Sequence, residues 1–125
     1  MPEFEVVSAH LQPAPGRTTG ARAQGRTADG ARIAIALVAA SSGIATDALL
    51  NLKRSSAPVA AARQLAMYVA HVGLGLSQAD VARVFQRDRT TVAHACRRIE
   101  DLRDGTSFDR RVSLLEACAR WAVED

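Results

Sequence analysis

The chain has 125 residues, of which 16 are basic and 13 acidic, so its net charge is +3. This length suffices for one domain with a modest hydrophobic core. The most apolar run, residues 33–40, is too short to span a bilayer, and no signal-peptide pattern opens the chain. We therefore expect a cytoplasmic protein without a membrane segment.

Residues 1–30 differ in composition from the rest of the chain. They contain Pro13 and Pro15 and repeated Gly-Arg-Thr and Gly-Ala-Arg tripeptides. This composition predicts a flexible, mostly disordered tail ahead of a domain formed by residues 31–125. The arginines of the tail could contact a DNA backbone, although a solvated tail is the simpler interpretation.

Apolar residues recur at helical spacing from Ala31 onward. They predict a first helix that ends near Gly43 and a short second helix capped by Thr46. A basic loop follows at residues 53–58, and its Pro58 suits the first turn of a third helix. Two glycines, at 73 and 75, break this third helix. Its predicted buried stripe consists of Ala62, Leu65, Ala66, Val69 and Val72.

The next two segments are typical of a helix-turn-helix. Ser77 can cap a helix over residues 78–85, with Asp80 at the capping-box position. Gln86 and Arg87 form the turn, and a second helix follows until Gly105. Apolar residues at steps of three and four give this second helix a buried face formed by Val92, Ala95, Cys96, Ile99 and Leu102.

The last segment predicts one more amphipathic helix. Because no run within residues 31–125 alternates apolar and polar residues, we expect no sheet. The predicted fold class is all-α, a compact domain of about six helices that contains a helix-turn-helix. The apolar face of the last helix is predicted to comprise Phe108, Val112, Leu115, Ala119 and Ala122, widened by Leu114, Cys118 and Trp121.

Catalytic chemistry is not indicated by the sequence. Cys96 and Cys118 lie on apolar stripes without a Cys or His at metal-ligand spacing, so we expect buried, reduced thiols and no metal site. The three histidines, His10, His71 and His94, are scattered and have no acid or thiol at helical spacing. We therefore expect no enzyme, no catalytic residues and no cofactor.

The charge of the chain is unevenly distributed. Seven acidic residues and four arginines lie from residue 99 onward, whereas five arginines lie between Arg83 and Arg98. The positive field should therefore lie upstream of residue 99, between Arg32 and Arg98. The start of the second helix of the motif lies within this range, and a helix N-terminus also attracts phosphate. The face of the second helix that is not buried carries polar and basic side chains typical of a DNA-recognition helix: Thr90, Thr91, Ala93, His94, Arg97 and Arg98.

The stretch from Ala62 to Leu102 closely resembles the C-terminal DNA-binding domain, the domain IV type, of the bacterial replication initiator DnaA. The resemblance rests on Ala-Arg-Gln-Leu-Ala-Met-Tyr-Val-Ala, Leu-Ser-Gln-Ala-Asp-Val-Ala-Arg-Val-Phe and Arg-Asp-Arg-Thr-Thr-Val-Ala-His-Ala-Cys-Arg-Arg-Ile-Glu. Weaker similarity reaches back to about Ile33. Stand-alone domains of this type occur as regulators, and some alphaproteobacterial activators of gene transfer agents resemble this module. The resemblance thus implies a nucleoid-associated transcription factor.

The resemblance, together with the charge pattern, assigns roles to individual residues. Base edges in the major groove are expected to contact Asp88, Arg89, Thr90 and Ala93. Phosphates are expected to contact a larger set from the basic loop and both helices of the motif. This set comprises Lys53, Arg54, Ser55, Arg63, Gln78, Arg87, Thr91, His94, Arg97 and Arg98.

Departures from the family concern sequence recognition. Arg89 stands where DnaA usually has His, Ala79 replaces a usual Pro, the minor-groove arginine aligns near Ala57, and the turn before Arg87 is one residue shorter. Arginine can make a bidentate contact to guanine that imidazole cannot, so we expect a different target sequence. No Gly-x-x-x-x-Gly-Lys-Ser/Thr motif is present, so we expect neither nucleotide binding nor initiator activity by this chain alone.

Two functions follow as hypotheses. The first is a sequence-specific regulator of transcription that binds double-stranded DNA. The alternative is a protein-interaction adaptor that docks on RNA polymerase or another replication or transcription partner, through Trp121 or the segment that contains Phe4, Val6 and Val7.

Overall fold

The computed structural model describes residues 17–53 and 55–124, and those residues form six α-helices and no strand. A π-helical turn, η1 (Val69–Gly73), directly continues α4. The all-α prediction is confirmed. The α-helices are α2 (Arg17–Ser42), α3 (Thr46–Leu50), α4 (Ala57–Tyr68), α5 (Gln78–Phe85), α6 (Arg89–Leu102) and α7 (Ser107–Glu124).

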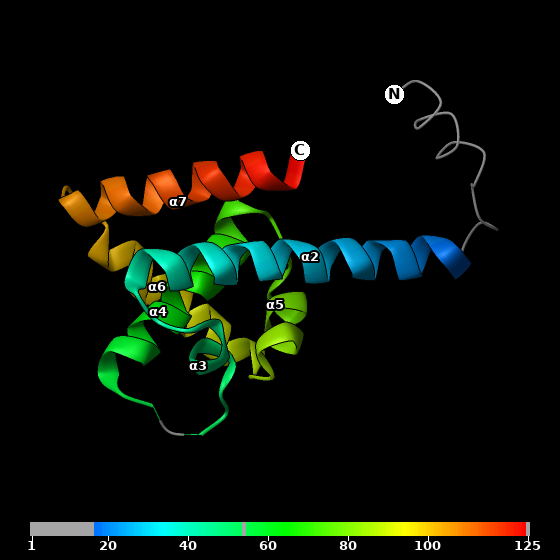
Figure 1. Cartoon of the computed structure of the whole chain (residues 1–125), viewed down its shortest axis with the longest axis horizontal. Coiled ribbons are helices and arrows are strands. Elements are labelled where there is room, and N and C mark those ends of the chain that lie inside the picture. Colours follow the sequence, from blue (N-terminus) through cyan, green and yellow to red (C-terminus); the bar gives the residue numbers. More distant parts are fainter. Residues whose placement is uncertain (1–16, 54, 125) are drawn as a thin grey trace.

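The long helix α2 crosses the whole molecule (Figure 1). It packs against α7 on one side and against α4 and α3 on the other. α6 packs against α4 and α5, and the turn between α5 and α6 lies on the side of the molecule away from α7. One hydrophobic core joins these helices, and its largest fully buried side chains are Tyr68, Phe85, Leu49, Met67, Val38, Val69, Val81, Val92 and Val112.

α2 begins at Arg17 rather than at Ala31, which corrects the predicted start of the first helix. At Gly30 the helix lies close to the segment after η1. A Cβ atom placed on Gly30 would lie 3.5 Å from Leu74 and 3.7 Å from Leu76, and Ala31 is fully buried. Part of the segment predicted as a tail is therefore helical, and the part of that prediction that concerns residues 1–16 lies outside the described residues.

The π-helical turn explains why Val72 departs from the predicted buried stripe. The N–H of Leu74 donates to the carbonyl of Val69, five residues earlier, at 3.0 Å. This wider turn rotates the following residues relative to an α-helix, and Val72 is 45% exposed. Leu102 is 48% exposed for a simpler reason, since it is the last residue of α6.

The helix ends agree with the predicted signals in most places. α4 has Pro58 in its first turn, and positive φ angles at Gly43 and Gly105 follow α2 and α6. α3 differs, because its N-cap residue is Ala45 and Thr46 is already helical. The Ser77 prediction is confirmed, since its Oγ accepts a hydrogen bond of 3.0 Å from the N–H of Asp80.

Replacing Ser77 with alanine should lower the free energy of unfolding by about 1 kcal/mol, because the N–H of Asp80 loses its acceptor. Urea denaturation measures this difference. Ser56 is the matched control, since it is the N-cap of α4 but makes no side-chain capping bond. An effect of Ser56→Ala as large as that of Ser77→Ala would contradict this assignment.

Candidate nucleic-acid interface

The turn between α5 and α6 fixes how α6 starts. Gln86 adopts the left-handed conformation (φ 55°), and the N–H of Arg87 donates to the carbonyl of Ala82 at 2.9 Å. Asp88 is the N-cap of α6, and its carbonyl accepts the first helical hydrogen bonds. Its carboxylate makes no capping bond, so this exposed side chain is available to an external partner.

The first turns of α6 present a polar and basic face to solvent. Val92, Ala95, Cys96 and Ile99 are buried, as their spacing predicts. Burial and the charge of Glu100 raise the pKa of Cys96 to about 11, so its thiol stays protonated at neutral pH. Ala93 is half-buried, whereas the other predicted contact residues of α6 and its N-cap are exposed: Asp88, Arg89, Thr90, Thr91, His94, Arg97 and Arg98.

Arg87 links this turn to the end of α3. Its guanidinium donates to the carbonyl of Phe85 at 2.9 Å and to that of Asn51 at 3.0 Å. Asn51 is the C-cap of α3 and lies two residues before the first residue of the basic loop, Lys53, which is exposed. The structure therefore brings the basic loop next to the start of α6, although these segments are far apart in sequence.

Arg63 has a structural role, which corrects its predicted role in phosphate contact. The residue is only 8% exposed, and its guanidinium points toward α3 instead of solvent. It donates to the carbonyls of Leu49 at 2.7 Å, Ala48 at 3.2 Å and Asn51 at 3.4 Å. Burial, and secondarily the nearby charge of Arg87, lower the pKa of Arg63. Its side chain thus satisfies carbonyls at the end of a helix that is too short to be stable alone.

We expect Arg63→Ala to lower the free energy of unfolding by about 1.5–3 kcal/mol, because several carbonyls lose a charged donor. Arg63→Lys should restore only part of this stability, since one ammonium cannot reproduce the planar fork. Arg97→Ala, at an exposed position, is the control and should change stability by less than about 0.5 kcal/mol. Equal effects of Arg63→Ala and Arg97→Ala in thermal or urea unfolding would contradict the structural role.

The remaining predicted residues lie around these segments. Ser55 is half-buried and accepts a hydrogen bond of 3.3 Å from Arg63. Gln78 is the first residue of α5 and is half-buried. Arg54 lies outside the described residues. A groove of about 270 Å³ between α4 and α6 is lined partly by Arg87, Thr91, His94 and Arg98.

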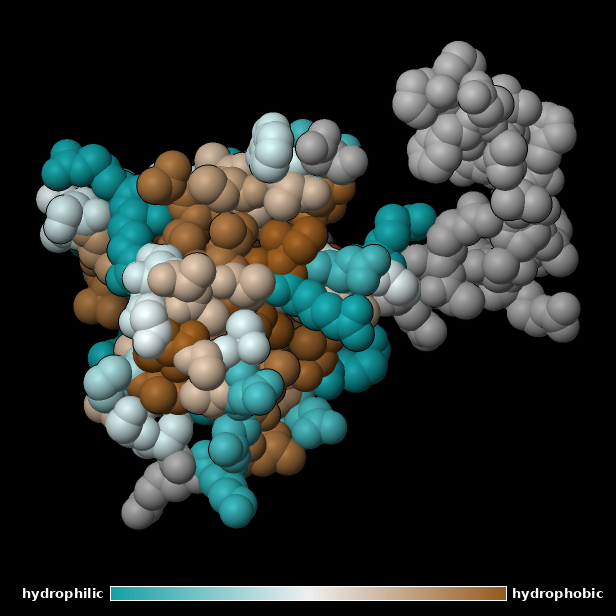
Figure 2. All heavy atoms as spheres, in the orientation of Figure 1, coloured by the Kyte–Doolittle hydropathy of each residue, from teal (hydrophilic) through white to brown (hydrophobic). Residues whose placement is uncertain are grey.

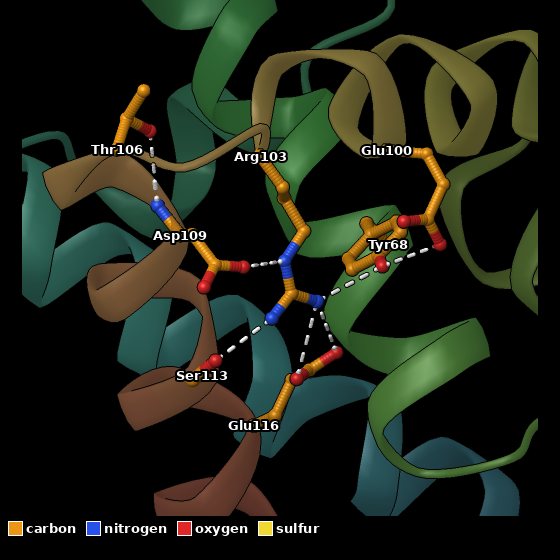
Figure 3. Close-up of polar contacts among 7 residues, drawn as sticks. All are labelled: Tyr68, Glu100, Arg103, Thr106, Asp109, Ser113 and Glu116. Atoms are coloured by element: carbon orange, nitrogen blue, oxygen red, sulfur yellow. Dashed lines mark hydrogen bonds and ion pairs between the residues drawn. The ribbon is translucent and has the colours of Figure 1, made fainter.

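A polar cluster that sequence reasoning missed joins α6 to α7 (Figure 3). Arg103, the C-cap of α6, donates to Asp109 at 2.6 Å, Ser113 at 2.8 Å and Tyr68 at 3.0 Å, and it lies 3.3 Å from Glu116. Burial disfavours its charge, but the bonds to Asp109 and Tyr68 and the charge of Glu116 raise its pKa overall. This cluster fixes the C-terminal end of α6 against the rest of the domain.

In Figure 2 hydrophilic residues project below the position of α3, and hydrophobic residues gather between the positions of α7 and α2. No helix in residues 17–53 and 55–124 is long and apolar enough to cross a membrane. Within the same residues no group of three or more His, Cys, Asp or Glu side chains could hold a metal ion.

Comparison with known proteins identifies this arrangement. The family described as "Bacterial dnaA protein helix-turn-helix" matches residues 32–99, more than half of the chain. The chain belongs to the bacterial DnaA helix-turn-helix family. The DnaA-type helix-turn-helix is a DNA-binding domain, and this membership supports binding of double-stranded DNA by the chain.

Two similar proteins extend this finding. The chain is 38% identical over 85 residues to the chromosomal replication initiator protein DnaA of Pseudothermotoga lettingae, and this match covers 66% of the chain but 19% of the initiator. The crystal structure of a DNA replication initiation factor superposes with a TM-score of 0.78 at 27% identity, covering 97% of this chain and 36% of the other. The chain thus spans only a minor part of the length of either relative.

Proposed function

We propose that this DnaA-type domain binds a specific duplex sequence and regulates transcription near that site. The observation that supports the proposal is the exposed start of α6, where Arg89 and Thr90 form the first helical turn. In a helix-turn-helix the first residues of the second helix lie in the major groove. These side chains would therefore be closest to base edges.

The side chains around this turn are suited to phosphate contact. Thr91, His94, Arg97 and Arg98 follow along the exposed side of α6, and Lys53 lies in the basic loop that Arg87 holds beside it. Such contacts position the helix on the duplex without selecting a sequence. Base recognition is then left to Asp88, Arg89, Thr90 and Ala93, with Gln78 and Ser55 as further backbone contacts.

Selection from a pool of random duplexes with the full chain tests sequence-specific binding. We expect enrichment of one short, asymmetric motif. A promoter that carries this motif should then respond to the protein in transcription assays, whereas a scrambled motif should not. Failure to enrich any motif would contradict specific recognition, and enrichment without a transcriptional response would contradict the regulatory role.

A further inference from the structure

α7 has a second apolar stripe on the side opposite to its buried face. Val112 and Ala119 are fully buried, whereas Leu114 is 65% exposed and Trp121 is 69% exposed. This corrects the prediction for Leu114 and Trp121, which do not widen the buried face, whereas Cys118 between them is half-buried. Leu114 and Trp121 lie seven residues, or two helical turns, apart, so they share one outward face of the helix.

This outward face ends in opposite charges. Arg110 lies one turn before Leu114, and Glu124 lies one turn after Trp121, and both charged residues are exposed. Ala117 lies midway, because each charged residue is two helical turns away from it. The face therefore runs in the order basic, apolar, apolar, acidic.

We propose that this face of α7 binds the same face of a second copy of the chain, with the two helices antiparallel. A two-fold axis near Ala117 would place Leu114 of each copy against Trp121 of the other. The same axis would place Arg110 of each copy against Glu124 of the other, so that the contact is isologous and closed. A parallel pairing would instead bring like charges together, which is unfavourable.

The proposed contact leaves the DNA-contacting surface free. α7 lies on the opposite side of the molecule from α3 and from the turn between α5 and α6 (Figure 1). One helix pair buries less than the roughly 800 Å² per partner of a standard interface. The dimer should therefore be weak, with a dissociation constant in the micromolar range or above. If the proposed function also holds, one dimer could bind two separate DNA sites.

Sedimentation velocity of the full chain without DNA, from low micromolar to near-millimolar concentration, tests the proposal. The wild type should shift from monomer toward dimer, and Trp121→Glu should weaken self-association at least about tenfold. Leu52→Glu is the matched control, since Leu52 is 60% exposed but lies beside the basic loop. A wild-type chain that stays monomeric would overturn the proposal. So would a Leu52→Glu variant whose self-association is weakened as much as that of Trp121→Glu. Circular dichroism should show that both variants remain folded.

A charge exchange tests the antiparallel arrangement. Arg110→Glu and Glu124→Arg should each weaken self-association several-fold, and the double variant should restore it. If the double variant self-associated more weakly than both single variants, the antiparallel arrangement would be wrong.

Oxidation provides a second test, because Cys118 lies beside the proposed axis. The wild type should form a covalent dimer through Cys118 that Cys118→Ser abolishes, since Cys96 is buried whereas Cys118 is only half-buried. A dimer that survives Cys118→Ser would overturn this geometry. None of these measurements involves DNA, so failure here is distinguishable from failure of the proposed function.

Discussion

Arg89→Ala should weaken binding to the preferred duplex by about 10- to 100-fold while changing the affinity for random duplexes much less. The reason is that Arg89 is the first residue of α6 and is exposed, which suits a bidentate contact to guanine worth about 1–3 kcal/mol. Fluorescence anisotropy with labelled preferred and scrambled duplexes measures both affinities. The ratio of the two affinities is the quantity that should fall.

Two variants separate base recognition from charge. Arg89→Lys keeps the charge but loses the planar fork, so it should restore non-specific affinity without restoring the ratio. Arg97→Ala should weaken binding to both duplexes alike, because its exposed side chain lies further along α6, where phosphate contact is expected. If Arg89→Ala left the affinity ratio unchanged, Arg89 would not be a base-contacting residue.

Arg103→Ala should lower the free energy of unfolding by about 3 kcal/mol. The Arg103 side chain is 18% exposed and that of Glu116 is 11% exposed, so removing the guanidinium leaves a nearly buried carboxylate without its partner. Tyr68 also loses a donor to its hydroxyl oxygen. This loss lies at the lower end of the range expected for breaking a buried ion pair. The reason is that Asp109, the other carboxylate bound to Arg103, is more exposed and can bind water.

Urea denaturation of Arg103→Ala and Arg97→Ala measures this effect against a control. Arg97 is an exposed arginine of α6, and its removal should change stability by less than about 0.5 kcal/mol. Adding Glu116→Leu to Arg103→Ala should recover part of the loss, because the unpaired carboxylate is then absent. A change for Arg103→Ala as small as that for Arg97→Ala would show that the cluster contributes little to stability.

Local signals predicted the helix-turn-helix well. The capping bond at Ser77 and the buried face of α6 depend on residues three or four positions apart, which a sequence displays directly. The family resemblance pointed to the same segment. By contrast, the assignment of exposed side chains to base contacts or to phosphate contacts stays a prediction.

Long-range contacts explain what the sequence did not reveal. Arg63 resembles a surface arginine in a basic region, yet its partners lie fourteen and fifteen residues earlier, at Leu49 and Ala48. Arg103 gathers Tyr68 and Glu116 from two other helices. No spacing rule indicates such pairs, because the packing of α3, α4 and α7 brings them together.

The salt dependence of binding to double-stranded DNA tests the central claim most directly. A titration of the full chain with a duplex over a series of KCl concentrations gives the slope of log K against log salt concentration. With about four to six phosphate contacts from the basic loop and α6, the slope should lie between about −3.6 and −5.4. Affinity that is absent at low salt, or that does not change with salt, would contradict the claim that α5 and α6 form a DNA interface.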